Sequence, residues 1–119
     1  MLKWKDENGA DCEVALDEDG ACVMLKLVHG KARFYQALSA TDVGRIIRMT
    51  GEHTGWWGHC CEGDLSVRGT DRFGVLRLGW NDEGVHHIVA LDRNETVAFC
   101  EALKGYCRLL MRTPRRGMP

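Results

Sequence analysis

Side chains that could bind a metal or act as nucleophiles gather in one stretch near the middle of the chain: His53, His59, Cys60 and Cys61. Imidazole and thiolate are the ligands that zinc and other borderline metals favour. The spacing matches no zinc motif, and a closed site would need a further ligand, such as His86 or His87. A loop and strand edge without metal explains the cluster more simply. We therefore expect neither a metal nor a cofactor.

The thiols indicate neither a disulfide framework nor a nucleophile. Six cysteines occur without any C-x-x-C pair: Cys12, Cys22, Cys60, Cys61, Cys100 and Cys107. The N-terminal stretch lacks the hydrophobic run of a signal peptide, so we expect a cytoplasmic protein with reduced thiols. A reactive thiolate needs a positioned base and an electropositive pocket, and the chain has no nucleophile–base motif. The sequence therefore gives no support for catalysis.

A different chemistry is indicated by Trp56, which lies in the unusual segment TGWWGH at 54–59. An aromatic ring beside cations suits binding of unpaired bases, because stacking contributes about 1–3 kcal/mol per base. Basic side chains expected on outward strand faces or in the tail would contact the phosphates: Lys3, Lys5, Lys26, Arg33, Arg68, Arg77, Arg115 and Arg116. The alternative is a Trp that fills a gap under a loop, beside an ordinary solvated sheet face.

The distribution of charge limits this hypothesis. The chain has 16 basic and 17 acidic residues and a net charge of −1. After Glu101 it has five cations and no acid: Lys104, Arg108, Arg112, Arg115 and Arg116. Residues 1–101 therefore carry a net charge of −6. Such an acidic body would restrict nucleic-acid binding to one face and the tail.

The elements that would position these side chains follow an internal repeat. A shift of 53 residues, without gaps, superposes several pairs: Trp4 on Trp57, Val14 on Val67, Leu25 on Leu78, and Leu38 on Leu91. The shift also preserves the hydrophobic period, which scattered identities would not do. The pattern therefore predicts a tandem duplication.

Each half carries strand signals. Apolar residues alternate with polar ones over short runs bounded by glycine-containing turns, which predicts antiparallel strands with one buried face. The predicted strands are 2–5, 12–16, 23–27 and 32–37 in the first half, and 56–59, 65–68, 76–80 and 85–91 in the second.

A helix signal follows the strands in each half. Two pairs have capping-box spacing: Ser39 with Asp42, and Asp92 with Glu95. Apolar residues then recur at helical spacing, as expected for helices that pack on a sheet. We predict that the first helix ends at Gly51 and that the second continues to about Arg112.

The chain therefore predicts an α+β protein of two tandem β-β-β-β-α repeats that form one pseudo-twofold domain. Repeat 1 spans 1–53, repeat 2 spans 54–112, and 113–119 form a basic tail. This order of elements covers nearly the whole chain and resembles the single-stranded nucleic-acid-binding superfamily of Whirly proteins, PUR repeats and positive-cofactor coactivators. The resemblance implies two four-stranded sheets packed with their helices, and a sheet face or groove that binds unpaired strands.

Two functions fit these expectations. The first is a small regulatory protein that binds single-stranded DNA or RNA on a sheet face. The alternative is a protein-interaction or regulatory module with neither nucleic-acid binding nor catalysis, whose partner is another protein or a second copy of the chain. No apolar run reaches the roughly 18 residues needed to cross a bilayer, so we expect no membrane partner.

Overall fold

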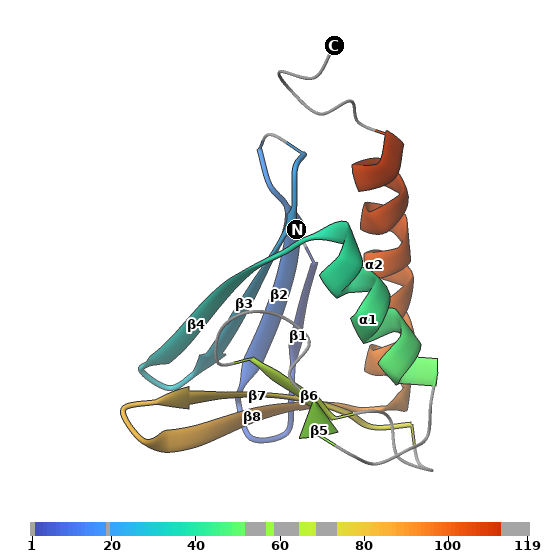
Figure 1. Ribbon diagram of the computed structural model, residues 1–119. Coiled ribbons are helices and arrows are strands. Elements are labelled where there is room, and N and C mark those ends of the chain that lie inside the picture. The colour runs from blue at the N-terminus through green and yellow to red at the C-terminus, as the bar shows by residue number, and fades with distance from the viewer. Residues whose placement is uncertain (1, 19, 52–56, 59–64, 69–73, 113–119) are drawn as a thin grey trace.

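The described residues form two antiparallel sheets and two helices. The computed structural model describes residues 2–18, 20–51, 57–58, 65–68 and 74–112 (Figure 1). Sheet A has the order β1 (Leu2–Lys5), β2 (Asp11–Leu16), β3 (Val23–His29), β4 (Ala32–Leu38). Sheet B has the order β5 (Trp57–Gly58), β6 (Ser66–Arg68), β7 (Leu76–Asp82), β8 (Val85–Leu91). Helix α1 (Ala40–Gly51) follows β4, and α2 (Arg93–Arg112) follows β8.

Alternating side chains give each sheet one buried and one outward face. In β3, Val23, Leu25 and Leu27 are fully buried, and the residues between them are only partly buried. β7 buries its inward residues in the same way: Leu76, Leu78 and Trp80. Burial of each of these large apolar side chains stabilises the fold by about 1.5–3 kcal/mol. The predicted alternation is therefore confirmed in both sheets.

Two-residue turns close the central hairpins. β3 and β4 are joined by Gly30 (φ 63°) and Lys31, and β7 and β8 by Glu83 (φ 48°) and Gly84 (φ 81°). Positive φ at these positions matches the right-handed twist of the strands, and glycine adopts it without steric cost. The strands therefore extend to residues 29 and 82, beyond the ends at 27 and 80 that the sequence predicted.

Both helices begin at the predicted capping boxes. The Asp42 N–H donates to Ser39 Oγ (3.2 Å), and the Ser39 N–H donates to Asp42 Oδ2 (3.1 Å). The equivalent pair at α2 has distances of 2.8 Å from the Glu95 N–H to Asp92 Oδ1 and 3.0 Å from the Asp92 N–H to Glu95 Oε1. These bonds satisfy N–H groups that the helix itself leaves unpaired, which explains where each helix starts.

The helices and both sheets share one buried interior. Figure 1 shows α1 and α2 side by side on the same side of sheet A, with sheet B lying across the lower end of that sheet. Trp4 packs edge-to-face on the buried Phe99 of α2, with ring centroids 5.5 Å apart. The rings of Phe34 in sheet A and Trp80 in sheet B pack together with their centroids 6.4 Å apart. The side chain of Trp57, predicted to match Trp4, lies outside the described residues.

A buried carboxylate ties the two halves together. Asp6, which is 9% exposed, lies in the turn between β1 and β2, and its Oδ1 accepts the N–H groups of Asn8 (2.9 Å) and Ala10 (2.8 Å). Its Oδ2 accepts the N–H of Ala90 in β8 at 3.1 Å. Ala90 lies on the outer edge of β8, the last strand of sheet B. One side chain therefore shapes a turn of sheet A and binds the edge of sheet B.

Candidate nucleic-acid interface

Four of the predicted basic residues lie on the outward face of sheet A, because alternation and register place them together. One cross-strand row runs Lys3, Glu13, Lys26, Tyr35 from β1 to β4. The neighbouring row runs Lys5, Asp11, Val28, Arg33. Lys3, Lys5, Lys26 and Arg33 therefore lie on one outward face.

The outward face of sheet A also carries two carboxylates that the sequence analysis did not consider. Lys3 Nζ lies 3.5 Å from Glu13 and 3.7 Å from Asp11, and Lys26 Nζ lies 3.8 Å from Glu13. Both acids alternate with the buried Cys12 and Val14 along β2, a pattern that already assigns them to the outward face. The β1–β2 half of this face is therefore nearly neutral, with two cations and two carboxylates.

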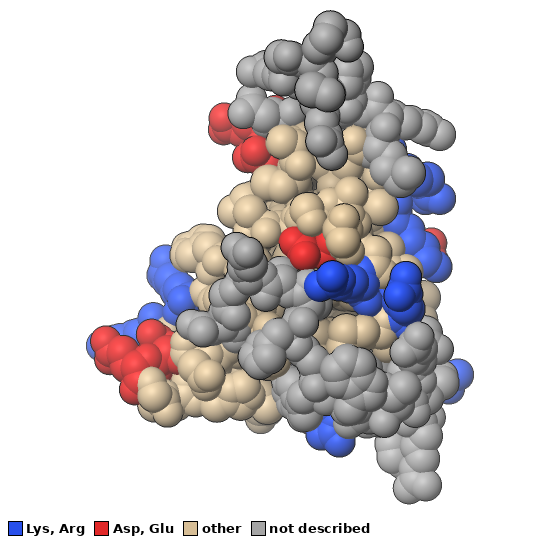
Figure 2. All heavy atoms as spheres, viewed as in Figure 1, with Lys and Arg blue, Asp and Glu red and all other residues tan. Residues whose placement is uncertain are grey.

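The β3–β4 half of the face is different. Its outward residues, here called the Tyr35 face, are Met24, Lys26, Val28, Arg33, Tyr35 and Ala37. Tyr35 is 56% exposed, and Lys26 Nζ lies 5.7 Å from the centre of its ring. Figure 2 shows basic side chains along the β3–β4 hairpin, above acidic ones at the tip of the β7–β8 hairpin. The Tyr35 face therefore combines an exposed aromatic ring with two cations, of which Lys26 also pairs with Glu13 of the neighbouring strand β2.

The remaining predicted residues do not join the Tyr35 face. Arg68 and Arg77 are direct cross-strand partners on the outward face of sheet B. Trp56, Arg115 and Arg116 lie outside the described residues. The predicted binding residues thus fall on two separate sheets as far as the structure describes them, and the exposed aromatic ring on the outward face of sheet A is Tyr35.

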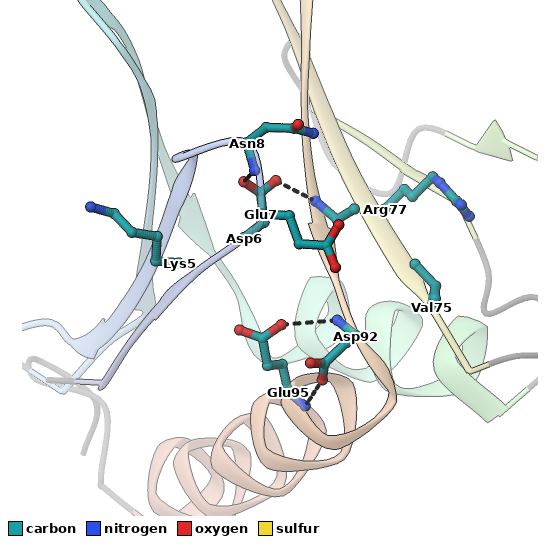
Figure 3. Close-up of a pocket in the computed structure, with 9 residues that line it drawn as sticks. Lys5, Asp6, Glu7, Asn8, Val75, Arg77, Asp92 and Glu95 are labelled. Carbon is teal, nitrogen blue, oxygen red and sulfur yellow. Dashed lines mark hydrogen bonds between the residues drawn. The ribbon is translucent and has the colours of Figure 1, made fainter.

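A cavity of about 450 Å³ opens between the β1–β2 turn and the start of α2 (Figure 3). Its polar lining includes four carboxylates and two cations: Asp6, Glu7, Asp92, Glu95, Lys5 and Arg77. Asp6, Asp92 and Glu95 accept the backbone bonds given above, and the side chains of Lys5 and Arg77 extend away from the centre. These carboxylates stabilise turns and a helix start, so the cavity is explained by the fold.

Two of the described thiols, those of Cys12 and Cys22, are poor nucleophiles. Burial, followed by the charges of Glu13 and Glu95, raises the pKa of the Cys12 thiol far above its ordinary value. Burial and the neighbouring Asp17 also raise the pKa of Cys22. Higher pKa values leave less thiolate at neutral pH, which lowers reactivity.

The cluster for which we expect no metal lies outside the described residues: His53, His59, Cys60 and Cys61. Within the ranges that the structure describes, no group of three or more His, Cys, Asp or Glu side chains could hold a metal ion.

The chain matches no protein-family model and no curated protein. Neither helix in the described part of the chain is long and apolar enough to cross a membrane. The assignment of a function therefore depends on the geometry of the outward faces.

Proposed function

We propose that this protein binds single-stranded DNA or RNA on the Tyr35 face. The observation that carries the proposal is the exposed Tyr35 ring with Lys26 beside it, on a sheet half whose outward positions carry no acid. Every base has a π-face, so such a ring binds unpaired bases with little sequence preference. Arg33, two residues from Tyr35 on the same face of β4, would contact a phosphate of the stacked nucleotide.

The size of the interface sets the expected strength of binding. One stacked base contributes about 1–3 kcal/mol. Two phosphate contacts, through Lys26 and Arg33, would give a salt slope of about −1.4 at ~0.7 per contact for single strands. We expect weak binding at low salt that decreases further as salt is added. A duplex should bind less well, because its stacked bases cannot reach the ring.

We further propose that the chain is a tandem duplication with pseudo-twofold symmetry. Under the 53-residue shift, the β3–β4 register (Val23 with Leu38) maps onto the β7–β8 register (Leu76 with Leu91). The β2–β3 and β6–β7 registers also correspond, and both helices start at equivalent residues. The register of β5 on β6 is offset from that of β1 on β2. This order of elements is the one that resembles the Whirly and PUR superfamily.

The two sheets would then differ in function. The counterparts of Lys26, Arg33 and Tyr35 under the shift are Gly79, His86 and Ile88. Sheet B therefore has no phenol ring and no permanent cation at these three positions. We infer that the ancestral pair of faces has become one binding face on sheet A.

Fluorescence anisotropy with a labelled oligo-dT strand at low salt tests the proposal. Tyr35→Ala should weaken binding by about 1–3 kcal/mol, that is, roughly five- to 150-fold, without changing the salt slope. Tyr35→Phe should retain binding because the ring remains. Val85→Ala is the matched control: Val85 is also 56% exposed but lies on the other hairpin.

The charge contribution has its own pair of variants. Arg33→Ala should reduce the salt slope by about 0.7, whereas Arg48→Ala, which removes an exposed cation from α1, should leave it unchanged. Binding that is absent at low salt, equal for duplex and single strand, or indifferent to Tyr35→Ala would reject the proposal.

A further inference from the structure

Two histidines from opposite halves of the chain meet where sheet A and sheet B cross. His29 ends β3 and His87 lies in β8, 58 positions apart in the sequence. Their Nδ1 atoms are 3.1 Å apart, and the rings stand edge-to-face with centroids at 5.3 Å. Both side chains are half-buried, so the pair is in contact with solvent. From this geometry we propose that His29 and His87 together bind a divalent transition-metal ion such as Zn²⁺ through their Nδ1 atoms.

The distance between the two nitrogens suits a shared metal ion. With Zn–N bonds of about 2.0–2.1 Å, nitrogens 3.1 Å apart subtend an N–metal–N angle of about 98°. This value lies between the right angle of square or octahedral sites and the tetrahedral angle. In the direct contact the N–H of one ring points at the lone pair of the other, so both rings must turn away from the line between the nitrogens for their lone pairs to converge on one ion.

Binding of the metal requires no net gain or loss of protons by the two rings. In the direct contact, one ring must carry its proton on Nδ1 and the other must present a lone pair. With a metal bound, both Nδ1 atoms act as ligands and both rings carry their proton on Nε2. The change is a shift of one proton from Nδ1 to Nε2 within one ring. Both imidazoles stay neutral, and no other reactant is needed.

The surroundings hold one of the ligand rings in place. Trp80 stacks on His87, with centroids 5.1 Å apart and an interplanar angle of 24°, and Phe34 packs against Trp80. The buried Nε1–H of Trp80 has no acceptor among the described residues.

The site would be an open one. The part of the chain that the structure describes offers no third His, Cys, Asp or Glu ligand there. Water or a small anion would complete the coordination, as in metal sites with exchangeable positions. Imidazole ligands favour zinc and its neighbours over Mg²⁺. A bound ion would crosslink sheet A to sheet B independently of the Tyr35 face, so this inference does not depend on the proposed function.

Imidazole ¹⁵N NMR of the full chain, titrated with ZnCl₂ under reducing conditions, tests the proposal. We expect Zn²⁺ to shift the Nδ1 resonances of His29 and His87 together, and MgCl₂ to shift neither. His87→Gln should abolish the shift at His29, because a single imidazole is then left to hold the ion. His86→Gln, which alters the neighbouring residue on the outward side of β8, should leave both shifts unchanged.

Three results would overturn the proposal. The first is that the two Nδ1 resonances in the unaltered chain remain unshifted at saturating Zn²⁺. The second is that His29 Nδ1 still shifts when His87 is replaced. The third is that zinc binds but shifts only His53 or His59, which would assign it to the cysteine-rich segment. The measurement on the unaltered chain decides the question even if a variant does not fold.

Discussion

The carboxylate of Asp6 offers the sharpest test of how the two sheets are held together. Asp6→Ala removes the acceptor for three backbone N–H groups, at 2.8, 2.9 and 3.1 Å. A hydrogen bond to a charged group contributes about 1.5–3 kcal/mol when its partner is buried. Ala10 is fully buried, whereas Asn8 is exposed and its N–H can turn to water. We therefore expect Asp6→Ala to lower the free energy of unfolding by about 3–5 kcal/mol.

A second variant isolates the contact between the sheets. Asp6→Asn keeps one oxygen for Asn8 and Ala10, but its NH₂ group faces the N–H of Ala90 and cannot accept from it. The loss should be smaller, about 1–3 kcal/mol. Glu7→Ala is the matched control, since this neighbouring acid is exposed and should change stability by less than about 0.5 kcal/mol.

Urea denaturation at neutral pH, followed by circular dichroism, measures these differences. The unaltered chain and Glu7→Ala should be the most stable, Asp6→Asn less stable, and Asp6→Ala the least stable. If Asp6→Asn is as stable as the unaltered chain, the bond to Ala90 contributes nothing and the account of how β8 is attached is wrong. If both Asp6 variants are equally unstable, the turn bonds contribute nothing beyond the bond to Ala90.

Three further predictions concern a cap, two glycines and the thiols. Ser39→Ala should destabilise the fold by about 1 kcal/mol in thermal melts because it removes the α1 cap, and Ser39→Asp should restore stability. Gly79→Ala should cost about 1–3 kcal/mol, because the added Cβ would lie 2.9 Å from neighbouring side-chain atoms. Gly105→Ala, with open space around it in α2, should instead stabilise by up to about 1 kcal/mol in the same assay; destabilisation would contradict the placement. Mass spectrometry of the native protein after brief alkylation should show Cys12 unmodified and the more exposed Cys22 modified; early labelling of Cys12 would contradict its burial.

The fold could be predicted because its signals are local. Alternation marks the strands, and the spacing of Ser39 and Asp42 marks the start of α1. The ends of the strands are predicted less accurately than the strands themselves. The turn after β3 consists of only two residues, Gly30 and Lys31, so β3 continues to His29. The sequence predicts the first strand of the second repeat at 56–59. Among the described residues this strand, β5, comprises only Trp57–Gly58.

The candidate site could be predicted only in part, because it depends on contacts between distant residues. Alternation along the strands predicts that the cations point outward. The ion pairs of Glu13 with Lys3 and Lys26 depend instead on the register of three strands. Tyr35 carries no motif that marks it, and its exposure follows from its outward position in β4 opposite Lys26. The pairing of His29 with His87 has no local signal, because it arises from how the two sheets cross.

Chemical-shift mapping is the measurement that tests the central claim most directly. A ¹H–¹⁵N spectrum of the full chain is recorded during titration with unlabelled oligo-dT at low salt. The account predicts that the largest shifts fall on the Tyr35 face, at Lys26, Arg33 and Tyr35, while the exposed Val97 and Leu109 of α2 stay unchanged. Shifts that concentrate on α2 or on sheet B, or a spectrum that does not change at saturating oligonucleotide, would contradict it.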